Sequence, residues 1–419
     1  MTAQREAARV RRVDVLVVGA GPAGLAAAAR LAAAGAGRVE VLEREARAGG
    51  VPRHCAHGGF GTWTHPLTGP GYARLLTEAA TRAGAVLRTG VTVLDRVDPG
   101  PVRTAFGGSA RTTPDGSDGA EPGGPDRVGP GGPYGTAPGG PYGTAPGGPY
   151  GTAPGGPWWT ERGGPGGMPT GGSGAASAPG IGGAAVDGTS DQPRVFLTTV
   201  GPGGPETIAA RAVVLATGSR ERPRAARLVP GTRPAGVYTT GELQQAVHLF
   251  GQTIGTRAVV VGAQDVSYAA ADTVRASGAV VVALVTDRPR AGTTRARAQW
   301  SRLRRRVPLL TDTTVTELLG HGRLSGVRVR HRDGRTAALP CDTVVFTGDF
   351  VPDDELARRG GITLDTSPYT SRTGVFAAGA VLRPGQRAGA ATRDGAETAG
   401  AVLEWLAEGD WPRPLRPGA

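Results

Sequence analysis

The 419-residue chain contains no lysine and no asparagine, so all 47 residues in its Lys+Arg count are arginine. The absence of lysine excludes Schiff-base chemistry, a P-loop lysine and any lysine-based activation of oxygen. The formal net charge of +12 would by itself favour nucleic acid as a partner, but the arginines are scattered over every segment. Such scattering is typical of a solvated surface, so we expect no nucleic-acid partner.

Cysteine is also scarce, because only Cys55 and Cys341 are present and they form no CxxC pair. This spacing predicts neither a zinc site nor a redox dithiol, and we expect no metal site. The first dozen residues lack the apolar stretch of a signal peptide, and no run approaches the ~18 apolar residues of a membrane helix. We therefore expect a soluble, cytoplasmic protein without a membrane partner.

The most informative stretch of the sequence runs from Asp14 to Glu43. Val15–Val18 predicts a strand buried on both faces, a glycine-rich turn follows, and an alanine-rich helix extends to about Ala34. Val39–Leu42 predicts the next strand, which ends at the acid. A glycine-rich turn alone could be structural, but strand, turn, helix, strand and acid in this register favour a dinucleotide-binding unit.

Each glycine of this GxGxxG turn has its own expected task. Gly19 permits the sharp turn, Gly21 lets a pyrophosphate approach the backbone, and Gly24 lets the helix pack closely on the strand. The N-terminus of the helix offers unpaired N–H groups and a partial positive charge to phosphate. Glu43 is placed to accept hydrogen bonds from the hydroxyls of an adenosine ribose.

Residues 99–193 have a different composition, dominated by glycine, proline, serine and threonine. The octapeptide GGPYGTAP occurs three times in tandem between Gly131 and Pro154. We expect a disordered insertion, since this segment buries too little apolar surface to offset its backbone entropy. Its aromatic residues could contact a partner, although an insertion tolerated in a surface loop is the simpler interpretation. The strands Val91–Asp95 and Val195–Thr199 are expected to pair across it in a small β-meander.

A second strand–helix–strand unit begins with the strand Ala258–Val261 and the turn at Gly262. Gln264 and Ser267 stand where the second and third glycines of a dinucleotide-binding turn belong. The Cβ of Gln264 would block a pyrophosphate, and Asp265 adds a negative charge at the same place. We expect this second site to be degenerate, and whether it binds NAD(P) stays open.

Three motifs in order, VVGAGPAGLAAAARL with Glu43, VVLATGSRERP and TGVFAAG, resemble the two-dinucleotide-binding-domain flavoproteins of the pyridine nucleotide–disulfide oxidoreductase type. The segments GGVPRHCAHGGFG, LTGPGYARLL and CDTVVFTGDFVPDDELAR are similar to a narrower group. That group comprises the FAD-bearing subunits related to sarcosine oxidase alpha, opine and hydroxyproline dehydrogenases and hydrogen cyanide synthase. The resemblance implies an α/β fold with two Rossmann-like domains, the FAD-binding domain being discontinuous and containing the small β-meander.

The resemblance also implies FAD as the cofactor, with its pyrophosphate on the first glycine-rich turn. The acid that usually ends the late motif is replaced by Ala380, the family's dithiol is absent, and we expect no long C-terminal dimerisation domain. The N-terminus of the last helix is expected to point at the pyrimidine end of the flavin. The expected FAD contacts are Gly19, Gly21, Pro22, Ala23, Gly24, Glu43, Arg44, Gly49, Gly50, Val93, Ala216, Thr217, Gly218, Gly379 and Ala380.

His54, Cys55 and His57 form the one cluster of reactive side chains in the sequence. As catalytic residues they could line the flavin, position an amine or carboxylate, or accept a proton. Alternatively, Cys55 is a small packing residue and the histidines bond to the backbone. The arginine run Arg302–Arg306 is either a solvated helix face or a docking surface for an acidic redox partner.

These observations predict an FAD-dependent oxidoreductase, a dehydrogenase or dehydrogenase subunit acting on a small amine or amino-acid-like substrate. Partner subunits, including a ferredoxin-like or second flavoprotein chain, are consistent with the resemblance. The alternatives are an NAD(P)H-dependent flavin reductase and a non-catalytic FAD-binding scaffold subunit. The expected domains are the FAD-binding domain in three parts, 12–98, 194–225 and 339–408, the insertion 99–193, and the NAD(P)-binding-like domain 226–338.

Overall fold

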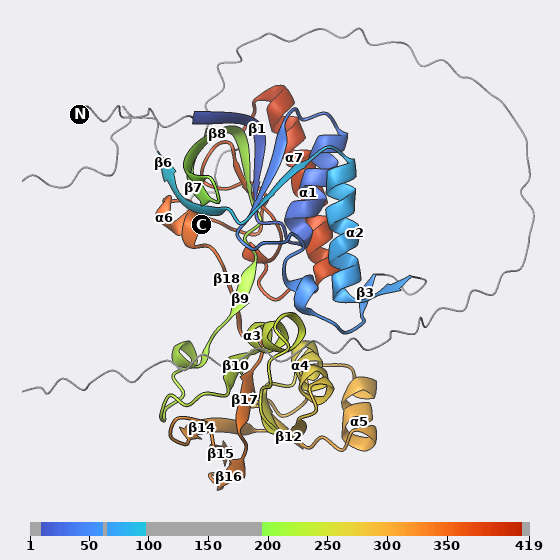
Figure 1. Cartoon of the computed structure of the whole chain (residues 1–419), viewed down its shortest axis with the longest axis vertical. Coiled ribbons are helices and arrows are strands. Elements are labelled where there is room, and N and C mark those ends of the chain that lie inside the picture. Colours follow the sequence, from blue (N-terminus) through green and yellow to red (C-terminus); the bar gives the residue numbers. More distant parts are fainter. Residues whose placement is uncertain (1–9, 62–64, 98–194, 413–419) are drawn as a thin grey trace, which may run out of the picture. The chain divides into compact units, whose positions relative to one another are not determined.

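The computed structural model describes residues 10–61, 65–97 and 195–412. The first of its sheets is mixed and has seven strands (Figure 1). The expected insertion, residues 99–193, lies outside the described residues. The strand order is β5-β2-β1-β8-β7-β6, with β19 paired to β8. These strands are β1 (Val10–Val18), β2 (Val39–Glu43), β5 (Val86–Thr89), β6 (Thr92–Val97), β7 (Val195–Gly201), β8 (Gly204–Leu215) and β19 (Val375–Ala377).

The two strands that flank the insertion pair as expected. β6 and β7 are antiparallel, with Val93 opposite Thr199, and β7 pairs in turn with β8. By contrast, β1, β2, β5 and β19 join the sheet through parallel pairings. Strands β6, β7 and β8 therefore form the expected β-meander, although β6 and β7 are far apart in the sequence.

Three helices pack on one another beside this sheet (Figure 1): α1 (Pro22–Ala33), α2 (Gly69–Arg82) and α7 (Ala388–Glu408). Helix α2 begins directly after Thr68, whose side chain caps it by accepting a hydrogen bond from Gly71 N–H. Helices α1 and α7 approach closely because both are rich in small residues. A Cβ at Gly395 of α7 would lie 2.0 Å from the carbonyl oxygen of Ala23. This close contact fixes the first turn of α1.

The second sheet contains five parallel strands in the order β10-β17-β11-β12-β13. Helices α3, α4 and α5 accompany it, and α3 continues as a π-helix over Gln245–Leu249. The elements are β10 (Val237–Thr239), α3 (Thr240–Gln244), β11 (Arg257–Val261), α4 (Asp265–Ala276), β12 (Val280–Val285), α5 (Arg295–Arg304), β13 (Leu309–Leu310) and β17 (Thr343–Phe346).

The strand β17 lies in this second sheet, whereas the sequence suggested that residue 339 begins the last part of the FAD-binding domain. Asp342 explains the placement, because its carboxylate accepts hydrogen bonds from the backbone N–H groups of Thr256 and Arg257. These bonds hold the start of β17 beside β11, and Val344 pairs with Val259. The sequence motif could not reveal this pairing, since its two strands are more than 80 residues apart.

The second half of the fold, which contains the five-stranded sheet, also contains a three-stranded antiparallel sheet. Its strands are β14 (Thr313–Leu319), β15 (Gly326–His331) and β16 (Thr336–Pro340). Strand β16 was not predicted, because most of its side chains are exposed and give no apolar alternation. The remaining short elements are β3 (Phe60–Gly61), β4 (Pro66–Leu67), β9 (Ser219–Glu221), β18 (Phe350–Pro352) and α6 (Glu355–Arg359).

Strands β9 and β18 form a two-stranded antiparallel link between the two sheets. Glu221, at the end of β9, is largely enclosed and accepts hydrogen bonds from Thr240 N–H and Gly348 N–H, both at 2.7 Å. Burial raises the pKa of Glu221, although these hydrogen bonds oppose the change. The carboxylate thereby ties the link to the start of α3, where the helix N-terminus favours a negative group.

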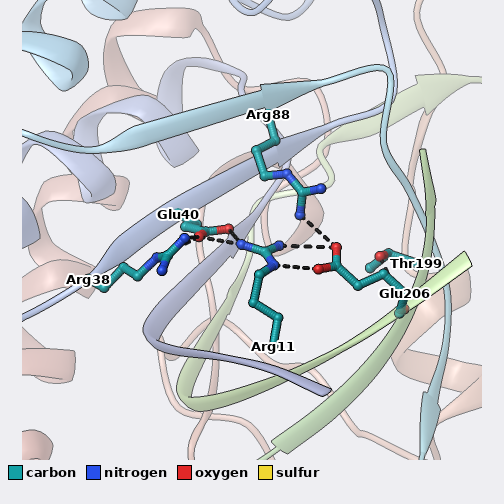
Figure 2. A network of polar contacts seen from close by, with 6 residues as sticks. All are labelled: Arg11, Arg38, Glu40, Arg88, Thr199 and Glu206. Atoms are coloured by element: carbon teal, nitrogen blue, oxygen red, sulfur yellow. Dashed lines mark hydrogen bonds and ion pairs between the residues drawn. The ribbon is translucent and has the colours of Figure 1, made fainter. Parts of the chain in front are cut away.

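An ion network around one buried carboxylate joins four strands of the first sheet (Figure 2). Glu40 on β2 is fully buried, and both of its carboxylate oxygens bond to the guanidinium of Arg11 on β1. The same guanidinium bonds to Glu206 on β8, to which Arg88 on β5 also donates at 2.8 Å. A planar arginine can serve two carboxylates at once, which a lysine ammonium cannot match. The network lies at the opposite end of β1 from the glycine-rich turn.

Candidate functional site

The first glycine-rich turn connects β1 to α1, and its glycines have separate structural reasons. A Cβ at Gly19 would lie 2.4 Å from the carbonyl oxygen of Ala216, and the residue has φ of +105°. A Cβ at Gly24 would lie 1.9 Å from the carbonyl oxygen of Gly19. Both residues are therefore required by packing within the protein. At Gly21, in contrast, a Cβ would meet no protein atom within 4 Å.

The N-terminus of α1 carries no cap of its own. Gly21 is the N-cap residue, no side chain bonds there, and the first turn contains no acid. The first N–H groups of a helix have no partner within the helix, so they remain available to an anion. Bare backbone at Gly21 and unpaired donors in the first turn of α1 fit the pyrophosphate of FAD.

Glu43 lies at the end of β2 and is held against this turn. Its Oε2 accepts a hydrogen bond from Ala20 N–H, and its Oε1 accepts one from Glu45 N–H, both at 2.9 Å. A carboxylate oxygen has two lone pairs, so each oxygen can accept one further bond from a ribose hydroxyl. Arg44 follows it, is mostly exposed, and lies 3.9 Å from Asp353.

The next expected contacts also lie around the turn. Gly49 donates a hydrogen bond to the carbonyl of Ala20 at 2.8 Å, and a Cβ at Gly50 would lie 2.8 Å from the Cα of Gly21. Ala216 bonds to the end of β1, and a Cβ at Gly379 would lie 2.5 Å from that of Ala23. Pro22 and Ala23, which were also expected to contact FAD, form the first turn of α1. Thr217 and Gly218 follow Ala216, and Ala380 follows Gly379. The last expected contact, Val93 on β6, packs against the hydrophobic core.

His54, Cys55 and His57 do not converge on one point. His54 is buried and its Nε2 lies 3.4 Å from Oε2 of Glu45. Cys55 is buried and its Sγ donates to Oε1 of Gln244 at 3.2 Å, whereas Nδ1 of His57 lies 2.7 Å from the carbonyl oxygen of Gly58. Three side chains with three separate partners do not form a nucleophile–base arrangement of the kind that covalent catalysis requires.

We expect Cys55 to resist alkylation in the folded protein. Burial raises the pKa of its thiol to about 12, so at pH 8 only about one thiol in 10⁴ is the reactive thiolate. With iodoacetamide at pH 8, the native protein should be labelled at Cys55 roughly a thousandfold more slowly than the urea-unfolded chain, as followed by peptide mass spectrometry. Labelling at comparable rates in both states would show that the thiol is accessible and activated.

The N-terminus of α4, in the second unit, differs from that of α1 because the chain caps it itself. Oγ of Ser267 accepts a hydrogen bond from Gln264 N–H at 3.0 Å and bonds to the hydroxyl of Thr347. The side chain of Gln264 reaches Gly348, where an added Cβ would lie 2.7 Å from Oε1 of the glutamine. The space over the turn is thus filled by protein atoms.

Asp265 places a carboxylate in the first turn of α4. It accepts hydrogen bonds from the hydroxyl of Thr293 and from Arg387, the latter at 2.7 Å. These hydrogen bonds, that of Thr293 foremost, lower its pKa, so it is ionised at neutral pH. Gly292, next to Thr293, donates to the carbonyl of Ala263, which brings this segment across the turn. A carboxylate and a crossing segment therefore lie at the turn where the second dinucleotide site is expected to be degenerate.

Several polar residues near the predicted cluster were missed by sequence reasoning. Gln244 receives the hydrogen bond of Cys55, and His248 lies in the π-helix that follows it. Burial, and secondarily the charge of His57, lower the pKa of His248. These residues come from a segment almost 190 positions away, so no local pattern could have identified them.

Neither a membrane-spanning helix nor a metal-binding group of His, Cys, Asp and Glu occurs in the part of the chain that the structure describes. Both cysteines are buried and free. Cys341 packs in the core of the second half, among residues such as Val344 and Phe346.

Comparison with known proteins identifies the family. The family described as "Pyridine nucleotide-disulphide oxidoreductase" matches residues 181–395, just over half of the chain, and an "FAD binding domain" matches residues 14–85. Sarcosine oxidase subunit alpha of Rhizobium meliloti is 29% identical over 203 residues, which cover 48% of this chain and 18% of that protein. The chain thus matches less than a fifth of the length of this relative.

Solved structures share the fold at low sequence identity. Thioredoxin reductase of T. acidophilum superposes with a TM-score of 0.63 at 18% identity, covering 95% of this chain and all of that one. L-proline dehydrogenase of P. horikoshii gives a TM-score of 0.52 at 13% identity, covering 95% of this chain and 57% of that one. With a bare dinucleotide-binding turn beside Glu43, two Rossmann-like units and a family match over half its length, this chain belongs to the pyridine nucleotide-disulphide oxidoreductase family and contains a match to an FAD-binding domain.

Proposed function

We propose that the chain is an FAD-dependent dehydrogenase, or the FAD-bearing subunit of one, that oxidises a small amine or amino-acid-like substrate. The observation that carries the proposal is the contrast between two helix N-termini. The first turn of α1 is bare and open at Gly21, whereas the first turn of α4 is closed by Gln264, Asp265 and Ser267. In this proposal the FAD site is kept and the second site excludes NAD(P), so the electrons come from another substrate.

The substrate class rests on the similarity to sarcosine oxidase subunit alpha, a protein named for its action on an amino acid. Bound FAD would supply the acceptor for two electrons and a proton from a carbon next to nitrogen. FAD would be bound by the fifteen residues expected from the sequence. Gly21 and the N-terminus of α1 would contact the pyrophosphate, and Glu43 would contact the ribose. The N-terminus of α7, which has no acid in its first turn, would favour negative charge near it.

Disulfide reduction is not supported by the cysteines. Such activity needs two thiols that can form a disulfide, and Cys55 and Cys341 are buried and unpaired, the second in the core of the second half. Their pKa values are raised by burial to about 12 and about 11, respectively. The fold shared with thioredoxin reductase therefore does not carry that activity to this chain.

A second candidate is a scaffold subunit that binds FAD while a partner chain supplies catalysis. It is favoured by the separate orientations of His54, Cys55 and His57, which leave no assembled group of reactive side chains. The relative is named as a subunit, which is consistent with either candidate. The partner expected in both cases is a ferredoxin-like chain or a second flavoprotein chain.

Anaerobic titration of the purified FAD-bound protein tests the proposal. We expect sarcosine, L-proline or another small amino acid to bleach the visible absorption band of the oxidised flavin. Failure of every amine and amino acid tested, with full FAD content, would favour the scaffold. Rapid bleaching by NADH and by no amine would favour the flavin reductase.

NAD(P)H itself is expected to reduce the flavin poorly. Loss of the phosphate cradle at Gln264 and repulsion from Asp265 should cost about 2–4 kcal/mol, roughly a thirty- to thousandfold loss in affinity. Anaerobic stopped-flow with millimolar NADH measures the rate. The double variant Gln264→Gly/Asp265→Ala should recover at least about tenfold in NADH affinity, and an unchanged affinity would show that another feature excludes the nucleotide.

A further inference from the structure

Residues 288–306 combine a high positive charge with exposed apolar side chains. This segment, which includes α5, contains eight arginines and no acidic residue. Trp300 is 56% exposed and Leu303 is 73% exposed. Both values are high for large apolar residues, and the two lie three positions apart on one helix, so they share a face.

Helix α5 uses its opposite face to pack on the second half of the fold, beside α4 (Figure 1). The guanidinium of Arg297 lies 5.8 Å from the ring centre of Tyr268, and Arg305 pairs with Asp272, both partners being on α4. Ser301 is buried between these contacts. The outward orientation of Trp300 and Leu303 therefore follows from packing, because their neighbours fill the inner face.

The exposed residues of this helix and its end form what we term the α5 surface. Within the part of the chain that the structure describes, its arginines form no ion pair, and Asp272 of α4 pairs instead with the neighbouring Arg305. The members of the α5 surface are Arg295, Gln299, Trp300, Arg302, Leu303 and Arg306. An apolar pair flanked by arginines matches the composition of protein interfaces, where tryptophan and arginine contribute most of the binding energy.

Other occupants fit this surface less well. A second copy of the chain would bring like charges together, which opposes association. A membrane would require a larger apolar face than two side chains on a ten-residue helix. Nucleic acid would engage the arginines but would give the exposed Leu303 no apolar contact, since phosphates surround the bases.

We propose that the α5 surface docks an acidic partner protein, with Trp300 and Leu303 inserted into an apolar pocket of the partner and the arginines facing its carboxylates. The proposal concerns a surface distinct from the FAD site and does not depend on which substrate is oxidised. The arginines would speed the encounter, and the apolar pair would slow dissociation.

Site-specific photo-cross-linking in the source organism tests the proposal. p-Benzoylphenylalanine replaces Trp300 in the full-length chain, and the same probe at Val280, which is 59% exposed on β12, serves as the control. We expect an adduct with one acidic protein at position 300 and none at position 280. Equal adducts at both positions, or adducts at 300 with nucleic acid or lipid only, would overturn the proposal.

The identified protein is then purified, and its affinity for the FAD-bound chain and its association rate are measured by surface plasmon resonance. Trp300→Ala/Leu303→Ala should weaken binding at least thirtyfold, and Arg302→Glu should lower the association rate about tenfold with a smaller dependence on salt. Val280→Ala should bind as the wild type does. FAD content and melting temperature of every variant should be unchanged, because the altered side chains are exposed. Binding of the double variant within twofold of wild type would overturn the proposal.

Discussion

Replacing Gly21 by valine is expected to yield a folded protein that no longer retains FAD. A Cβ at this position meets no protein atom within 4 Å, so the protein itself tolerates the side chain. The same space is where a pyrophosphate approaches the backbone at the N-terminus of α1. Filling it should cost about 3 kcal/mol of FAD binding, or more than a hundredfold in affinity. The visible spectrum after desalting and fluorescence titration of the apoprotein with FAD measure the loss.

Gly203→Val provides a matched control for this substitution. Gly203 lies in the turn between β7 and β8, and an added Cβ there also meets nothing within 4 Å. This variant should keep its full flavin content. Gly24→Val should behave in a third way and fail to fold, because its Cβ would lie 1.9 Å from the carbonyl oxygen of Gly19. A Gly21→Val protein with normal FAD content would show that the first turn does not anchor the cofactor.

Replacing Arg11 by methionine is expected to lower the free energy of unfolding by about 3 kcal/mol. The substitution leaves the fully buried carboxylate of Glu40 with Arg38 as its remaining cationic partner in the described network (Figure 2). Removing one member of a buried ion pair strands the other charge in a medium of low polarity. Chemical denaturation of the FAD-saturated protein, followed by circular dichroism, measures the change.

Two further variants separate this explanation from a simple loss of packing. Arg38→Met removes a side chain that is 54% exposed, and it should cost at most about 1 kcal/mol. Arg11→Met/Glu40→Leu removes the buried carboxylate together with its partly buried partner, and it should lie within about 1.5 kcal/mol of the wild type. An Arg11→Met protein no less stable than Arg38→Met would show that Glu40 is satisfied without Arg11.

Local patterns predicted the elements that have strong local causes. The strand, turn and helix around Gly19, and the strand and helix of α4, follow from buried apolar runs and glycine positions that any such unit requires. The position of β17 could not be predicted in this way, because an apolar strand of four residues fits either parallel sheet. Its place is decided by the hydrogen bonds of Asp342 to Thr256 and Arg257.

The sequence by itself determined that the chain has a dinucleotide-binding turn followed by an acid, and that the second turn lacks two of its glycines. Those properties depend on residue type and spacing within about 30 positions. Only the tertiary structure decided that His54, Cys55 and His57 have separate partners, that Asp265 bonds to Arg387, and that Trp300 and Leu303 face outward. The contacts of Cys55 with Gln244 and of Asp265 with Arg387 join distant segments, and the direction of a side chain is fixed by what packs against it.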